Sequence, residues 1–193
     1  MGFLVSAARI AVSFLLGSVP FAKVAMIGTG IDITKAGSKN PGFNNVWRVA
    51  NFPRALVALT GDIAKGYFAL LFFSGSQASA VLTWSMGIAA VAGHCWSPFL
   101  GFNGGKGVAT TAGVLLFLDW TITLPCLPLY PILRWFGRRR GWRQEGAIAS
   151  LTTMFVIATL VFAFKGFEPG LFAYVMFAIV VVRHAPNLRE IGN

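Results

Sequence analysis

Long apolar runs separated by short polar segments decide what this chain can fold into. The first three runs cover residues 3–27, 53–74 and 78–93, and the last two cover 146–164 and 167–182. Only 11% of the residues are charged, whereas a soluble domain carries about 25%. A water-soluble fold of this size could not hide so much apolar surface. The sequence therefore predicts an all-α integral membrane protein, organised as a single domain over residues 1–193.

One further apolar stretch, residues 108–133, decides the number of spans. Asp119 and three prolines interrupt it, so it fits either one kinked span or two short passes joined by a turn near Leu118–Thr121. The chain then has six or seven spans. With seven spans, twelve of the sixteen Lys and Arg residues fall on one side. The positive-inside rule therefore favours seven transmembrane helices, some short or broken, with the N-terminus outside and the C-terminus in the cytoplasm.

The polar segment 37–48 carries groups that suit a phosphate. It reads GSKNPGFNNVWR, and its candidate ligands are Ser38, Asn45 and Arg48. Glycine lets the backbone approach an anion closely, hydroxyl and amide side chains donate hydrogen bonds, and arginine offers a planar fork. A solvated, turn-rich loop with no ligand is the alternative interpretation.

The segment 93–111 contains the clearest anion-binding pattern. Its Gly104-Gly105-Lys106-Gly107 turn stands directly before an expected helix, so backbone N–H groups, the positive helix end and an ammonium would meet there. It is not a Walker A motif, because Leu100 and Gly107 stand where that motif requires Gly and Ser or Thr. This mismatch argues against a nucleotide triphosphatase. A glycine turn that serves packing alone is the alternative.

Asp62 and Lys65 are charged residues inside an expected span. They are three residues apart, so they can share a helix face and form an ion pair. Charges within the membrane usually face the protein interior and often serve function. The pattern leaves a structural and a functional ion pair equally open.

The segment Arg183-His184-Ala185-Pro186-Asn187 follows the last apolar run. A long cationic side chain that reaches from the end of a span to the membrane surface would account for Arg183. It would not account for His184 or Asn187. Ser150, by its position in a span, is an ordinary helix serine.

Composition and residue spacing limit the kinds of ligand that the chain is expected to bind. The net charge of +10 is explained by positive-inside loops and anion binding rather than by nucleic acid. Cys95 and Cys126 lack the spacing of metal or redox sites, so no metal site is expected. A carrier for phosphate or organic anions is the non-enzymatic alternative, although the cations cluster at one face and no inverted repeat is visible.

Together, these segments resemble the bacterial acyl-phosphate:glycerol-3-phosphate acyltransferases over essentially the whole chain. The resemblance implies a seven-helix enzyme of the inner membrane with its active site facing the cytoplasm. Such an enzyme moves a fatty acyl group from acyl phosphate to the 1-hydroxyl of glycerol 3-phosphate, giving lysophosphatidic acid and inorganic phosphate, without a cofactor or a required protein partner. The motifs that carry the resemblance are Gly17–Phe21, Gly37-Ser38 with Asn45 and Arg48, Asp62–Gly66, Gly93–Thr110, and Arg183-His184 with Asn187.

The resemblance also implies the site residues. Catalytic roles fall to Arg48, Lys106, Ser150 and His184, and only the resemblance singles out Ser150. Phe99 stands at the fifth position after His94, so the His-x-x-x-x-Asp dyad of acyl-CoA-dependent enzymes is absent. The residues expected to bind phosphate are Ser38, Asn45, Arg48, His94, Gly104, Gly105, Lys106, Gly107, Arg183 and Asn187.

Lys39, Phe43 and Asn44 depart from the family pattern, which has Gly, Ala and Thr there. These departures leave open an enzyme of the same fold that uses another acceptor, or that hydrolyses acyl phosphate. Because Ser38, Asn45 and Arg48 are retained, the expected phosphate site is unaffected.

Overall fold

A computed structural model describes residues 2–75 and 78–192 of the chain. Over these residues the secondary structure is helical, as predicted. The described residues form two compact units, Met1–Val114 and Leu115–Asn193. The elements are α1 (Phe3–Gly17), α2 (Phe21–Ala25), α3 (Phe43–Val49), α4 (Phe52–Phe73), α5 (Ala80–Cys95), the short 3-10 helix η1 (Pro98–Leu100), α6 (Val108–Cys126), α7 (Leu129–Arg139), α8 (Glu145–Lys165) and α9 (Phe167–Gly192).

The protein is an integral membrane protein with several spans. Within the described ranges, five helical stretches are long and apolar enough to cross a bilayer. Large apolar side chains such as Phe3, Phe72 and Phe164 are mostly exposed, as expected for surfaces that face lipid. By length and composition alone, the five stretches are Phe3–Ala25, Phe52–Phe73, Val108–Cys126, Glu145–Lys165 and Phe167–Glu190, and the first and third of them are interrupted.

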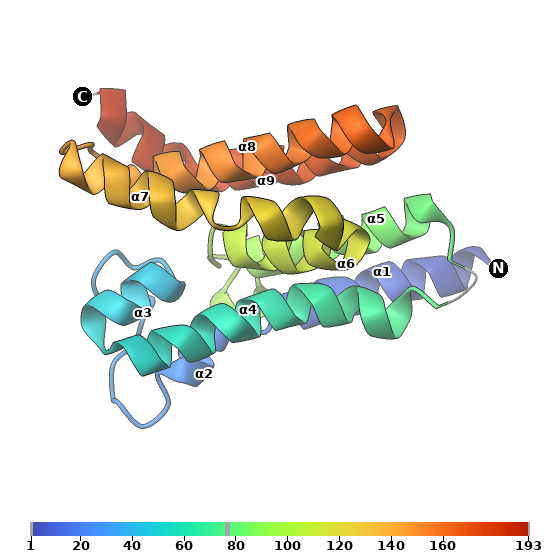
Figure 1. Ribbon diagram of the computed structural model, residues 1–193. Coiled ribbons are helices and arrows are strands. Elements are labelled where there is room, and N and C mark those ends of the chain that lie inside the picture. The colour runs from blue at the N-terminus through green and yellow to red at the C-terminus, as the bar shows by residue number, and fades with distance from the viewer. Residues whose placement is uncertain (1, 76–77, 193) are drawn as a thin grey trace. The chain divides into compact units, whose positions relative to one another are not determined.

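Glycines let the helices of the first unit pack closely. Helices α1, α4 and α5 lie side by side, with α1 and α5 running in one direction and α4 in the other (Figure 1). A Cβ at Gly17 would overlap the backbone of Ala90, and one at Gly93 would overlap the Phe14 carbonyl. In the same way, a Cβ at Gly66 would overlap the Thr110 carbonyl. Small residues at helix contacts are the usual basis of packing within membranes.

The first apolar run is broken into α1 and α2 at Ser18–Pro20. Pro20 has no backbone N–H and disfavours helical geometry at the residue before it. The Ser18 hydroxyl donates to the Phe14 carbonyl at 2.7 Å and closes the end of α1. The break leaves the Val19 carbonyl outside a regular helix, where it accepts a hydrogen bond from Lys65 Nζ at 2.7 Å.

The chain reverses direction at Asp119, which confirms the turn predicted near Leu118–Thr121. Asp119 has non-helical angles (φ −155°, ψ 79°). The Thr123 hydroxyl donates to the Leu115 carbonyl at 3.1 Å, although residues eight apart in a continuous helix are separated by about 12 Å. Asp119 Oδ1 accepts from the Ile122 N–H and the Thr121 hydroxyl, and so caps the second segment. Val108–Cys126 is therefore two short helical segments rather than one straight span.

Helices α8 and α9 form an antiparallel hairpin in the second unit (Figure 1). Gly166, with φ +90°, joins them, and Thr159 and Tyr174 share a hydrogen bond at 2.9 Å. The last apolar run was expected to end near residue 182, but α9 continues through Pro186. Arg138 on α7 pairs with Glu145 at 3.1 Å, which ties the Arg-rich end of α7 to the start of α8.

Candidate functional site

Asn45 orders the loop that carries the first set of predicted phosphate ligands. Its side chain is fully buried. Its Oδ1 accepts from the Ser38 backbone N–H at 2.8 Å, and its Nδ2 donates to the carbonyls of Ala36 at 3.0 Å and Ile33 at 3.3 Å. Because both ends of the amide are used by the loop, Asn45 is placed to hold Ser38 in position.

Ser38 and Arg48 are both exposed. Arg48 lies in the last turn of α3, a helix that forms where the sequence predicted only a polar loop. Asp32, earlier in the loop, accepts hydrogen bonds from the Thr34 hydroxyl at 2.7 Å and the Thr34 N–H at 3.0 Å. These bonds hold the pKa of Asp32 below its ordinary value, so this carboxylate is charged at neutral pH.

Two residues that depart from the family pattern, Lys39 and Phe43, are accommodated within the 37–48 segment and its neighbours. Lys39 has φ +59°, in the left-handed region that favours glycine. The Phe43 ring packs against Trp47 at a centroid distance of 5.6 Å and against Phe52 at 6.4 Å. The larger side chain therefore joins an aromatic cluster between α3 and the start of α4.

Three buried charged or titratable side chains meet in the first unit. Asp62 Oδ1 lies 2.8 Å from Lys65 Nζ and 3.5 Å from His94 Nδ1. Asp62 and Lys65 are each 3% exposed and His94 is 8% exposed. The structure confirms the predicted Asp62–Lys65 pair. It also brings to the pair His94, which the sequence pattern had assigned only to phosphate binding.

The glycine turn returns to the end of α5. The Gly105 N–H donates to the His94 carbonyl and the Gly104 N–H to the Cys95 carbonyl, both at 3.1 Å. Gly107, with φ +85°, then turns the chain into α6, whose first N–H groups have no partner within the helix. Lys106 is half-buried between these glycines. The glycine turn therefore leads directly into the start of α6.

Two hydroxyls in the first turns of α6 were not singled out from the sequence. Thr110 and Thr111 are buried, and their Oγ1 atoms have no hydrogen-bond partner among residues 2–75 and 78–192. A buried polar group of this kind usually has a partner. No spacing rule in the sequence would have revealed their burial.

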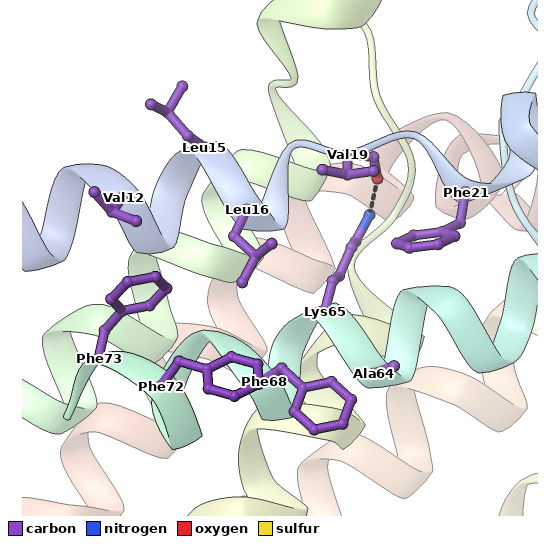
Figure 2. Close-up of a pocket in the computed structure, with 10 residues that line it drawn as sticks. All are labelled: Val12, Leu15, Leu16, Val19, Phe21, Ala64, Lys65, Phe68, Phe72 and Phe73. Atoms are coloured by element: carbon purple, nitrogen blue, oxygen red, sulfur yellow. Dashed lines mark hydrogen bonds between the residues drawn. The ribbon is translucent and has the colours of Figure 1, made fainter. Parts of the chain in front are cut away.

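An apolar groove of about 550 Å³ lies between α1 and α4. Figure 2 shows Val12, Leu16, Phe68 and Phe72 along it, with the Lys65 side chain reaching toward Val19 beside Phe21. Apart from Lys65, its lining is hydrophobic. The groove therefore suits an apolar ligand.

The second unit contains a buried serine and histidine, as the resemblance implied. Ser150 Oγ lies 3.3 Å from His184 Nε2, and both residues are at most 3% exposed. His184 Nδ1 lies 2.7 Å from the Val180 carbonyl. Because a carbonyl only accepts, Nδ1 carries a proton, and Nε2 on the other side of the ring faces the Ser150 hydroxyl. The Ser150 hydroxyl also bonds the Gly146 carbonyl of its own helix at 2.7 Å.

Gln144 links Asn187 to the start of α8. Its Oε1 accepts from Asn187 Nδ2 at 2.6 Å, and its Nε2 donates to the Glu190 carboxylate. Sequence reasoning missed Gln144, because the contact joins residues 43 positions apart. Arg183 is half-buried one position before His184 on α9.

A family model for glycerol-3-phosphate acyltransferase matches residues 7–193. The chain is 38% identical to the glycerol-3-phosphate acyltransferase of Laribacter hongkongensis (strain HLHK9), over 94% of this chain and 90% of that protein. It is 34% identical to that of Roseiflexus sp. (strain RS-1), over 99% and 94%.

The chain belongs to the glycerol-3-phosphate acyltransferase family. A crystal structure of PlsY, an integral membrane glycerol 3-phosphate acyltransferase, in its glycerol 3-phosphate form has a TM-score of 0.85 and 28% identity, covering 96% of this chain and 91% of that one. The lysophosphatidic acid form has a TM-score of 0.83. As a family member, the chain is a membrane acyltransferase, and the enzyme class predicted from the motifs is confirmed.

Proposed function

We propose that this acyltransferase uses acyl phosphate as its donor and the 1-hydroxyl of glycerol 3-phosphate as its acceptor. The hydroxyl oxygen attacks the acyl carbonyl carbon, and the bond from that carbon to the phosphate oxygen breaks. The products are lysophosphatidic acid and inorganic phosphate, and a substrate phosphate takes the hydroxyl proton. The donor is already activated, so the reaction needs no acyl-enzyme intermediate.

One observation carries this proposal: Lys106 is set in a glycine turn directly before α6. Both substrates carry phosphate, and their negative charges repel each other. A cation, backbone N–H groups and a helix N-terminus offset that repulsion and hold a phosphate in a fixed place. We assign phosphate binding in this unit to Lys106, Gly107, Ser38 and Arg48. Gly104, Gly105 and His94 are assigned to shaping the turn, because the N–H groups of the two glycines donate to the carbonyls of Cys95 and His94.

Asn45 has a different role in this account. Its amide is used by the carbonyls of Ile33 and Ala36 and by the Ser38 N–H. We therefore assign it as the positioning residue of the 37–48 segment, which keeps Ser38 and Arg48 available to a phosphate.

The second unit supplies the Ser150–His184 pair and two polar groups on α9. The His184 ring is held by the Val180 carbonyl with Nε2 facing Ser150, so the pair can orient a reacting group. Arg183 offers a fork for phosphate, and Asn187 offers an amide held by Gln144. We assign Ser150 and His184 to contact with the reacting groups of the substrates. Arg183 and Asn187 are assigned to phosphate binding.

The acyl chain of the donor is assigned to the groove between α1 and α4. The groove is apolar except for Lys65, and in a membrane a fatty chain would be held there by close packing rather than by removal from water. Ala64 lines the groove, whereas Leu71 on the same helix is exposed. Ala64→Trp should shift the preferred chain toward shorter acyl groups, and Leu71→Trp should not. An unchanged preference in Ala64→Trp would remove the groove from the proposal.

We further propose seven spans, with the N-terminus outside and the polar segments facing the cytoplasm. The test is cysteine labelling in a background that lacks Cys95 and Cys126. Asn103→Cys and Arg138→Cys, both exposed positions, should react with a membrane-impermeant reagent only from the cytoplasmic side. Labelling of the two positions from opposite sides would overturn the seven-span topology.

The test of the reaction uses purified protein in detergent. Acyl phosphate is supplied with and without glycerol 3-phosphate, and released phosphate and lysophosphatidic acid are measured. We expect one phosphate released for each lysophosphatidic acid formed, and release only with the acceptor. Release without the acceptor would indicate a hydrolase. Product formed from acyl-CoA but not from acyl phosphate would refute the proposed donor.

A further inference from the structure

The Asp62 carboxylate lies close to two side chains, although one cation is enough to neutralise its charge. Lys65, one turn along α4, lies 2.8 Å from Oδ1 and matches its charge. His94, from the end of α5, approaches the same oxygen at 3.5 Å. Burying charged groups is costly in a membrane, so the second contact calls for a role beyond pairing.

The contact orients the His94 ring. Nδ1 faces the Asp62 carboxylate oxygen at 3.5 Å. The other ring nitrogen, Nε2, lies against Gly105, where an added Cβ would overlap it. The His94 carbonyl meanwhile accepts the Gly105 N–H at 3.1 Å. His94 therefore contacts the glycine turn through both its ring and its backbone.

The turn is sensitive to the placement of this ring. Gly105 is buried and has no side chain that could adjust. The next residue is Lys106, and Gly107 has the left-handed angle that starts α6. A rotation of the His94 ring would press on Gly105 and displace the N–H groups and the ammonium that follow. Displacements of about 1 Å at such sites lower rates by about 100-fold.

We propose that Asp62 is a positioning residue of the acyltransferase reaction, acting through His94 on the Gly104–Gly107 turn. This inference rests on the proposed phosphate-binding role of that turn. Asp62 touches neither substrate; it holds the ring, and the ring supports the turn. Lys65, anchored to the Val19 carbonyl at 2.7 Å, keeps the carboxylate in place.

The test is a double-mutant cycle of Asp62→Asn and His94→Gln, with kcat and the KM of both phosphorylated substrates measured on folded protein. We expect Asp62→Asn to raise the KM of at least one substrate about 10- to 100-fold. The double variant should resemble His94→Gln alone, because Asp62 acts only through the ring. Wild-type KM values in Asp62→Asn would overturn the proposal. So would effects of the two substitutions on KM that add fully in the double variant.

A matched control and a rescue complete the design. Asp119→Asn also breaks a carboxylate–lysine pair, with Lys165 at 2.9 Å, and should leave both KM values unchanged. If Asp62→Asn fails to fold because Lys65 keeps a buried charge, Asp62→Asn combined with Lys65→Met removes both charges. That variant should fold with the raised KM, and a normal KM in it would refute the inference. Absence of transfer in the wild type would instead refute the proposed function.

Discussion

The two compact units each contain a buried histidine, and the two rings are held in different ways. In the first unit, His94 faces the carboxylate of Asp62, a residue of another helix. In the second, His184 faces the carbonyl of Val180, one turn earlier in its own helix. Beyond Nε2, His94 meets the Gly105 backbone, whereas His184 meets the Ser150 hydroxyl.

This difference indicates two roles for one residue type. The orientation of His184 is set within α9 by the Val180 carbonyl, so the ring faces the Ser150 hydroxyl without support from another helix. The orientation of His94 depends on α4, and the ring supports a backbone turn rather than a reacting group. We therefore expect His94 to govern substrate binding and His184 to govern the chemical step.

The largest expected effect comes from removing a cation of the proposed phosphate site in the first unit. Lys106→Ala should lower kcat/KM by about 10²- to 10³-fold, because a charged donor to substrate phosphate is lost. Arg48→Ala should do the same, and Arg48→Lys should not restore activity, since lysine lacks the planar fork.

The control for these variants is Lys35→Ala, which removes an exposed lysine of the same unit. It should retain wild-type kinetics. Near-normal rates in both Lys106→Ala and Arg48→Ala, with folding intact, would refute the phosphate site in the first unit.

Ser150→Ala tests the partner of the second histidine. It should lower kcat about 10- to 100-fold, the expected loss of one hydrogen bond to a reacting group. Thr153 provides a matched control, because its buried hydroxyl also bonds the carbonyl four residues earlier, at 2.8 Å. Thr153→Val should keep its kcat. If both variants lose activity equally, the serine serves helix packing alone.

Asn45→Ala tests whether the predicted ligand is a positioning residue. It removes the side-chain partner of the Ser38 N–H and of the Ile33 carbonyl, at about 1–3 kcal/mol for each group that stays buried, whereas the Ala36 carbonyl still accepts from the Lys39 N–H. We expect the melting temperature to fall by about 4 °C or more, with a weaker substrate affinity. Asn103→Ala, at an exposed position, should melt normally. An unchanged melting temperature in Asn45→Ala would contradict the assignment.

The smallest effect is expected at Lys39. A non-glycine residue in the left-handed region costs about 1–2 kcal/mol, partly offset by the greater freedom of glycine in the unfolded chain. Lys39→Gly should therefore raise the melting temperature by about 1–3 °C with normal kinetics. A changed preference for the acceptor would instead show that Lys39 takes part in recognition.

Much of the fold followed from local patterns. The apolar runs predicted helices, and the three-residue spacing predicted the Asp62–Lys65 pair. Asp119 left a kink or a reversal open in its apolar stretch, and the distribution of positive charge favoured the reversal that the structure shows. These features depend on hydropathy and on residues close in sequence. The helix α3 within a polar segment was missed, because its core residue Val46 is buried by tertiary packing.

Candidate residues of the site could be named from the sequence, but their arrangement in space could not. The Gly104–Gly107 turn and its ammonium could be recognised because glycine and lysine in that order suit an anion. The contact of His94 with Asp62 joins residues from two helices, and the Gln144–Asn187 bond also depends on tertiary packing. Likewise, the amide of Asn45 suited a phosphate as well as a carbonyl, and only its surroundings distinguish the two.

The most direct test of the two-histidine account is steady-state kinetics of His94→Asn and His184→Asn, measured side by side. Asparagine can keep a donor near the Nδ1 position but removes Nε2. We predict that His184→Asn lowers kcat with little change in KM, and that His94→Asn raises KM with a smaller change in kcat. The same kinetic defect in both variants would contradict the account.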